Sequence, residues 1–77
     1  VVPGGIGTLE EAIETWNAIK IGELQKRIGF LNVDGYFDKL FGFVSHCQEQ
    51  GFVKYEHMMI PEIDADVHAL MGKLLNS

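Results

Sequence analysis

Hydrophobic side chains recur at helical spacing in three stretches of the chain. The pattern predicts helices from about Thr8 to Ile21, from about Tyr36 to Gln50 and from about Ala65 to Leu75. Their inward faces are expected to comprise Leu9, Ala12, Ile13, Trp16 and Ile19, then Phe37, Leu40, Phe41, Val44 and Cys47, and finally Val67, Leu70, Met71 and Leu74. Gly22 and Gly51 stand where the first two helices should end, as glycine commonly does at that position.

Short apolar runs between these helices predict strands. Ile28 to Val33 suits a parallel strand that is covered on both faces. Met58 to Ile60 indicates another short strand, stopped by Pro61, and Val1 and Val2 indicate the end of a buried one. A short helical turn is expected at residues 53–56, just before the strand at Met58 to Ile60. Asp64 is expected to cap the last helix. This alternation of strands and helices predicts an α/β fold with a doubly wound parallel sheet.

Composition limits the domain organisation. The chain has 77 residues, 47% of them hydrophobic and five of them phenylalanine, and Cys47 has no partner for a disulfide. A chain this short buries a limited fraction of its surface. We therefore expect residues 1–77 to be the C-terminal part of a single larger α/β domain. The alternative is a small self-contained domain that is stabilised by oligomerisation.

Charge and hydropathy argue against several classes of partner. The net charge of −5 argues against nucleic acid. No apolar run approaches membrane-spanning length, so no membrane partner is expected. The lone Cys47 fits a reducing cytoplasm and an inert core position. His46, His57 and His68 lack ligand spacing, so no metal site is expected.

A glycine-rich stretch, Pro3 to Glu11, lies between Val1-Val2 and the first predicted helix. Thr8 with Glu11 three residues later resembles a capping box. A glycine-rich turn at a helix N-terminus leaves unpaired N–H groups, which favour an anion, most often phosphate. The candidate phosphate-binding residues are Gly4, Gly5, Ile6, Gly7 and Thr8.

The spacing in this stretch excludes two familiar phosphate loops. No lysine follows the last glycine, so it is not a Walker A loop. Glu10 stands where a dinucleotide-binding fingerprint has its third glycine. Neutral backbone donors suit a single phosphate better than a magnesium triphosphate. The alternative is a plain strand-to-helix turn with a good cap, in which Glu10 and Glu11 only stabilise the helix start.

A second polar cluster follows the strand predicted at Ile28 to Val33. Asn32, Asp34 and Gly35 supply turn chemistry at its carboxyl end. Ligands in open α/β sheets bind at that end of the strands, so this corner is a second candidate for the site. The alternative is a turn that merely caps the next helix.

Several of these residues together resemble a known family. The run Pro-Gly-Gly-x-Gly-Thr-x-x-Glu from Pro3 to Glu11, followed by Glu14, the block Gly29 to Phe37 and Gly51-Phe52, is similar to the LONELY GUY family. Its members are nucleoside 5′-monophosphate phosphoribohydrolases that release cytokinin bases, and many carry the older label lysine decarboxylase. The resemblance implies a Rossmann-like nucleotide-binding domain and no metal or organic cofactor. It also implies a cytokinin riboside monophosphate or AMP as ligand, and a homodimer.

The resemblance also implies roles for individual residues. Glu11 matches the motif glutamate that acts at the ribose and its N-glycosidic bond, and Glu10 is the adjacent candidate. In the family this glutamate acts with an arginine from the N-terminal half. Arg27 lies in a connector where relatives often have proline, and cannot replace it, so this chain alone is expected to be inactive. Ala18 stands where relatives usually carry a tryptophan, which bears on the shape of the base pocket.

Two other functions are weighed against the hydrolase. Molybdenum-cofactor carriers share the fold and a similar glycine-rich loop but only bind their phosphate-bearing ligand. A decarboxylase would need a lysine that forms a Schiff base with pyridoxal phosphate, and nothing in the sequence resembles such a site.

Overall fold

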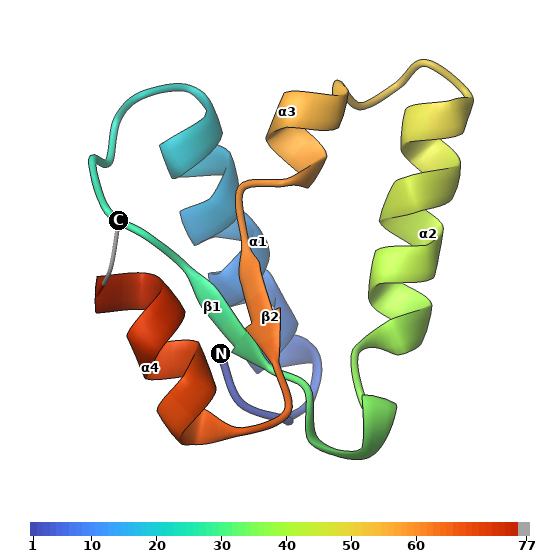
Figure 1. Ribbon diagram of the computed structural model, residues 1–77. Coiled ribbons are helices and arrows are strands. Elements are labelled where there is room, and N and C mark those ends of the chain that lie inside the picture. Colours follow the sequence, from blue (N-terminus) through green and yellow to red (C-terminus); the bar gives the residue numbers. More distant parts are fainter. Residues whose placement is uncertain (76–77) are drawn as a thin grey trace.

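The computed structural model describes residues 1–75 as helices around a small sheet (Figure 1). In chain order the elements are α1 (Ile6–Lys20), β1 (Gly29–Leu31), the 3-10 turn η1 (Val33–Gly35), α2 (Asp38–Glu49), α3 (Tyr55–Met58), β2 (Glu62–Asp64) and α4 (Val67–Leu75).

The two strands are parallel, with Phe30 of β1 opposite Ile63 of β2. Val1 continues the sheet on the other side of β1. Its amino group donates to the Gly29 carbonyl at 2.6 Å, and its carbonyl accepts from the Leu31 N–H at 2.7 Å. A parallel neighbour bonds in this staggered way. Val1 therefore bonds as the expected end of a strand, whereas Val2 is exposed rather than buried.

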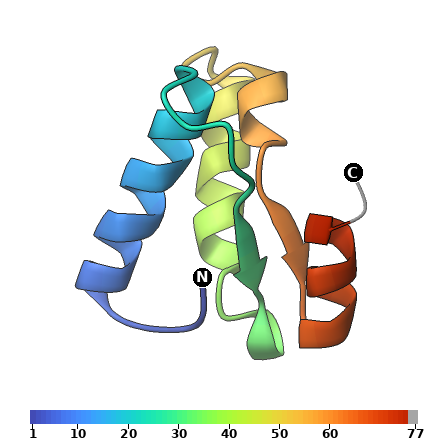
Figure 2. The same ribbon diagram turned by 90° about the vertical axis from the view of Figure 1, so that its left-hand side faces the viewer.

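Helices cover both faces of the sheet (Figure 2). α4 lies on one face, and α1 and α2 lie on the other. Gly29 faces α4 so closely that an added Cβ would come within 3.0 Å of the Leu70 and Leu74 side chains. Phe30, the next residue, points to the opposite face, as alternation along a strand requires. The expected α/β class, with a parallel sheet covered on both sides, is confirmed. That these residues form the C-terminal part of a larger domain stays a prediction.

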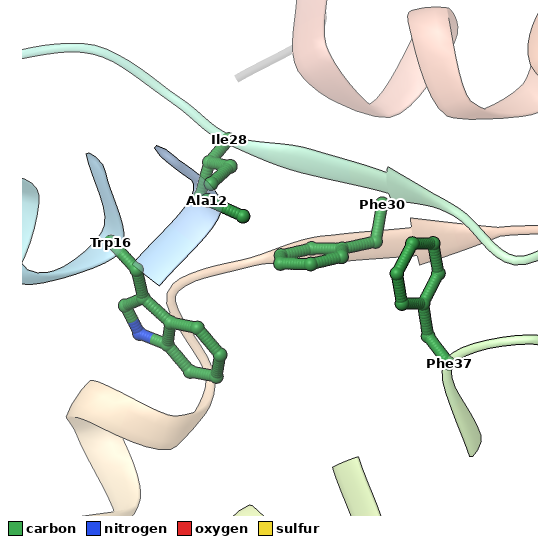
Figure 3. Packing of buried hydrophobic residues seen from close by; sticks show 5 residues of the cluster. All are labelled: Ala12, Trp16, Ile28, Phe30 and Phe37. Carbon is green, nitrogen blue, oxygen red and sulfur yellow. The ribbon is translucent and has the colours of Figure 1, made fainter. Parts of the chain in front are cut away.

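The core is an aromatic cluster under α1 and α2 (Figure 3). Phe30 has no exposed surface. Its ring meets Phe37 at 5.2 Å and Phe41 at 5.0 Å, both edge-to-face, and Trp16 lies 6.1 Å away. The indole N–H of Trp16 donates to the His57 carbonyl at 2.9 Å, so its buried polar atom is satisfied. The cluster therefore joins α1, β1, α2 and the α3 turn.

The ends of the first two helices agree with the sequence pattern. Gly22 has φ 85° and Gly51 has φ 83°, a region that only glycine adopts at little cost. After α1 the Glu23 N–H donates to Ala18, and after α2 the Phe52 N–H donates to Cys47. These bonds satisfy carbonyls that the helix end leaves free, as in a Schellman motif.

The predicted capping box at the start of α1 is wrong. α1 begins at Ile6, with Gly5 in the N-cap position and no side chain capping it. The first helical bond runs from the Leu9 N–H to the Gly5 carbonyl at 3.1 Å. Thr8 therefore lies inside the first turn, where its side chain packs back against Gly4. Because the helix starts early, Glu11 plays no part in capping.

The predicted strand at residues 58–60 is also wrong. Met58 ends α3, and β2 starts only after Pro61. The ladder begins with the Glu62 N–H, which donates to the Ile28 carbonyl at 2.9 Å. Proline has no N–H to offer a ladder, so it precedes the strand here rather than ending it. The helical turn expected at residues 53–56 lies two residues later, in α3.

The boundaries and inward faces of the helices differ in smaller ways. α2 begins at Asp38 rather than Tyr36. α4 begins at Val67, and Asp66 rather than Asp64 caps it, because the Asp66 carboxylate accepts from the His68 N–H at 3.1 Å. Three residues expected to face inward are substantially exposed: Ile13, Val67 and Met71. Ile13 and Met71 lie at the edges of their apolar stripes, and Val67 is the first residue of α4.

Asp64 gives a pH-dependent contribution to stability. The Asp66 N–H donates to its carboxylate at 2.9 Å, and Lys73 lies 3.1 Å from it. The Asp66 hydrogen bond, followed by Lys73, lowers the pKa of Asp64 below its ordinary 3.8. A folded-state pKa below the unfolded value stabilises the fold above pH 3.8, and this contribution is lost as the pH falls through the folded value.

We therefore expect Asp64→Asn to destabilise the protein at pH 7, and we expect this difference to shrink as the pH falls below 3.8. Urea unfolding of both proteins across this range measures the difference. Lys73→Gln should reproduce only part of the loss, because the Asp66 hydrogen bond remains. A difference between Asp64→Asn and wild type that is independent of pH would contradict this assignment.

Candidate active site

The start of α1 presents a row of backbone N–H groups to solvent. Within residues 1–75, the N–H groups of Ile6, Gly7 and Thr8 have no hydrogen-bond acceptor. The Gly5 N–H has none in that part of the chain either. Nothing lies within 4 Å of a Cβ built on Gly5 or Gly7. The backbone is therefore open to close approach by an anion, which the positive end of the helix dipole also favours.

Glycine serves a different purpose at Gly4. A Cβ there would come within 3.0 Å of the Thr8 Cβ. None of Gly4, Gly5 and Gly7 has positive φ. A left-handed backbone therefore does not explain the glycines of this loop. At Gly4 a side chain would collide with Thr8, whereas at Gly5 and Gly7 the missing side chain leaves open space beside the backbone.

The turn after β1 lies at the same end of the sheet as the glycine-rich loop (Figure 1). Asn32 accepts the Phe37 N–H at 2.7 Å and donates to the Asp38 carboxylate at 2.8 Å. Asp34 takes the left-handed conformation, with φ 52°. The Asn32 side chain thus holds the entry to α2, as expected for a turn that caps the next helix.

One side chain of this turn reaches the loop. The Tyr36 hydroxyl donates to the Gly4 carbonyl at 2.5 Å, and its ring packs edge-on against Phe37 at 5.1 Å. Tyr36 itself is exposed over 55% of its surface. The contact with Gly4 was missed because it joins residues far apart in the sequence. The only signal was a polar-tipped aromatic at the carboxyl end of a strand.

Glu11 lines an open hollow beside this loop. The hollow measures about 450 Å³ and is bounded by Val1, Val2, Thr8, Glu11, Ala12, Thr15 and Ile28. The Glu11 side chain is exposed and makes no hydrogen bond or ion pair with any other residue of the range 1–75. Thr8, whose N–H is free at the helix start, also lines the hollow. Three residues of helix, a rise of about 4.5 Å along the axis, separate it from Glu11.

The other candidates lie elsewhere. Glu10 is exposed but does not line this hollow, and Arg27 is exposed in the connector before β1. Cys47 is a half-buried free thiol on α2. Over the described range, no three histidine, cysteine or acidic side chains are grouped so as to hold a metal ion. A smaller apolar hollow of about 170 Å³ lies between α1 and α2 and includes Trp16 and His57.

No helix in the described part of the chain combines the length and apolar character needed to cross a membrane.

Comparison with known proteins gives consistent matches. The family described as possible lysine decarboxylase matches residues 1–74. In Oryza sativa subsp. japonica, the probable cytokinin riboside 5′-monophosphate phosphoribohydrolase LOGL9 is 40% identical over 73 residues, which are 95% of this chain and 32% of the relative. In Arabidopsis thaliana, the probable enzyme LOG6 is 46% identical and the enzyme LOG3 is 44% identical, each over 52 residues.

The Arabidopsis alignments cover 68% of this chain and 26% and 24% of those relatives. The chain thus spans about a third of the rice relative and about a quarter of the Arabidopsis ones. Because the family match covers nearly all of the chain, the chain belongs to the LONELY GUY family, whose older description is possible lysine decarboxylase.

Proposed function

We propose that the protein containing this chain is an enzyme that hydrolyses the N-glycosidic bond of a nucleoside 5′-monophosphate. The substrate is a cytokinin riboside monophosphate or AMP, and the products are the free base and ribose 5-phosphate. The names of the relatives support this substrate class. The proposal rests on the row of unpaired N–H groups at the start of α1. Beside them lies a hollow lined by Glu11, whose carboxylate makes no hydrogen bond or ion pair within residues 1–75.

In this proposal the two parts of the site bind different groups of the substrate. The N–H groups of Gly5, Ile6, Gly7 and Thr8 bind the 5′-phosphate, and Gly4 shapes the loop. Repulsion between a carboxylate and a phosphate places Glu11 at the sugar instead. The helical rise between Thr8 and Glu11 provides that separation. The hollow also falls within the range of volumes usual for small-molecule sites, about 300–1,000 Å³.

The chemistry follows from a carboxylate at the ribose. Cleavage of an N-glycosidic bond passes through an oxocarbenium-like state at the anomeric carbon, as in glycoside hydrolysis. The Glu11 carboxylate stabilises that positive charge and accepts a proton from the attacking water. The bond from the anomeric carbon to the base nitrogen breaks with its electron pair going to that nitrogen, which takes up a proton, and the new bond is to the water oxygen. A homodimer and a cytoplasmic location remain predictions from the family resemblance and the sequence.

A lysine decarboxylase is the less favoured function. Such an enzyme forms a Schiff base on a lysine within its site. The residues that line the hollow beside Glu11 include no lysine within the range 1–75. Lys73 is engaged elsewhere, with Asp64 and the Ile63 carbonyl.

The test is to incubate the full-length protein with AMP and, separately, with a cytokinin riboside monophosphate, and to measure released base. We expect release from at least one of them, together with an equal amount of ribose 5-phosphate. No release from either, combined with tight retention of the nucleotide, would overturn the hydrolase proposal in favour of a carrier of a phosphate-bearing ligand, such as molybdenum cofactor.

Gly7→Ala should affect helix stability and phosphate binding in opposite directions. A methyl group at Gly7 meets nothing within 4 Å, and alanine favours a helix over glycine by up to about 1 kcal/mol. We expect Gly7→Ala to keep or raise the unfolding midpoint while it weakens ribose 5-phosphate binding at least tenfold, because the methyl group occupies the space of the anion. Calorimetric titration and thermal unfolding measure the two effects.

Gly4→Ala is the matched comparison, since its methyl group would instead collide with Thr8. This variant should lose stability by roughly 1–3 kcal/mol, as overpacked sites do. Unchanged ribose 5-phosphate affinity in Gly7→Ala would place the anion away from this loop.

A further inference from the structure

We propose that Tyr36 is a positioning residue that locks the Gly4–Gly5 peptide in the orientation needed for anion binding. The inference rests on the proposed function for its role in catalysis. Its structural basis is the hydrogen bond from the Tyr36 hydroxyl to the Gly4 carbonyl, at 2.5 Å.

Peptide geometry connects this bond to the anion site. The Gly4 carbonyl and the Gly5 N–H belong to one planar unit, and the described chain has no cis peptide bond. In a trans unit the carbonyl and the N–H point in opposite directions. Holding the carbonyl on Tyr36 therefore directs the Gly5 N–H away from Tyr36. There it has no acceptor among residues 1–75, like the N–H groups of Ile6 and Gly7 that follow it in the chain.

Without this bond the peptide has little to keep it in place. Gly5 has φ −95°, and reversal of the peptide would move it to about +85°. Glycine accepts positive φ at little cost, and Gly4 on the other side of the peptide is equally permissive. The reversed peptide would point a carbonyl, instead of an N–H, at the bound anion. Two adjacent glycines thus make the reversal easy, and Tyr36 opposes it.

Tyr36 is itself well anchored. Its ring packs edge-on against Phe37, whose N–H is held by Asn32 and whose own ring lies against the fully buried Phe30. The exposed Tyr36 ring is thus supported on one side by a residue of the core, and its hydroxyl bonds across a sequence separation of 32 residues. A hydroxyl held by these contacts preorganises the loop before the ligand arrives, which favours affinity.

Tyr36→Phe removes the hydroxyl and keeps the ring. Tyr55→Phe is the matched control, because Tyr55 is similarly exposed and its hydroxyl has no hydrogen-bond partner in the range 1–75. In full-length Tyr36→Phe protein, we expect binding of ribose 5-phosphate to weaken roughly fivefold, the equivalent of one net hydrogen bond of about 1 kcal/mol. The KM should rise by the same factor with kcat within about twofold, since saturating substrate selects the productive orientation. Tyr55→Phe should change neither.

A second readout needs no ligand. In the ligand-free proteins, NMR relaxation dispersion at the Gly5 and Ile6 amides should show new exchange in Tyr36→Phe and none in wild type or Tyr55→Phe. The absence of new exchange, or an equal change in both variants, would overturn the peptide lock. Should wild type bind no ribose 5-phosphate, the proposed function fails, and the amide exchange still decides the lock.

Discussion

Glu11→Gln is expected to lower kcat for nucleotide hydrolysis by about 10²–10⁴-fold, the usual contribution of a positioned acid or base. The amide keeps the size of the side chain but cannot accept a proton, and it stabilises a cation poorly. Affinity for ribose 5-phosphate should change less than threefold, because the proposed phosphate site consists of backbone N–H groups of the preceding turn. Steady-state kinetics and calorimetric titration on the full-length protein give the two numbers.

Two further variants show whether the effect belongs to Glu11 alone. Glu10→Gln tests the neighbouring candidate, which does not line the hollow, and its effect on kcat should be below tenfold. Glu23→Gln removes the same charge from an exposed connector after α1 and should leave kcat unchanged. If Glu11→Gln lost activity only in proportion to a loss of folded protein, its role would be structural.

Phe30→Ala is expected to cost roughly 3–5 kcal/mol of unfolding free energy, the usual loss when a buried aromatic is truncated. Phe30 has no exposed surface and lies edge-on to Phe37 and Phe41. Its removal opens a cavity at the junction of β1 with α1 and α2. Urea unfolding, followed by tryptophan fluorescence from the nearby Trp16, measures the loss.

Phe30→Leu serves as the comparison, since it keeps most of the apolar contact and gives up the edge-to-face geometry. Its cost should be less than half that of Phe30→Ala. Equal losses in both variants would mean that the aromatic contacts, and not the filled volume, dominate at this site. A loss below 1 kcal/mol in Phe30→Ala would mean that the cluster is not the centre of the core.

Local patterns predicted the parts of the fold that depend on neighbouring residues. Helical spacing located α1, α2 and α4, and glycines marked the ends of α1 and α2 because a left-handed residue is needed there. The apolar run before Asn32 located β1. Asn32 itself was expected in a turn that caps α2, and its side chain holds the Phe37 N–H.

The errors arose where a short local motif competed with long-range pairing. Thr8 and Glu11 have the spacing of a capping box, but α1 starts at Ile6, with Gly5 as its cap. Met58 to Ile60 looks like a strand, yet the sheet pairs the next segment, Glu62 to Asp64, with β1. Apolar residues suit a helical turn or a strand equally well, so the pairing partner decides between them.

For the candidate site too, local motifs could be predicted and long-range contacts could not. The glycine-rich loop and Glu11 could be singled out, because their chemistry lies within nine consecutive residues. Tyr36 could not, because its hydrogen bond to Gly4 exists only once the turn after β1 lies beside the loop.

By itself, then, the order of residues determined which segments form helices, where glycine ends them, and that backbone donors gather before the first helix. The tertiary structure alone decided where that helix begins, which segment pairs with β1, that Glu11 faces a hollow, and that Tyr36 reaches the loop. The physical reason is the sequence separation of the residues whose interactions fix each feature. Backbone conformation and helix ends depend on residues within a few positions, whereas sheet pairing and the surroundings of a side chain depend on groups brought together by burial of the aromatic core.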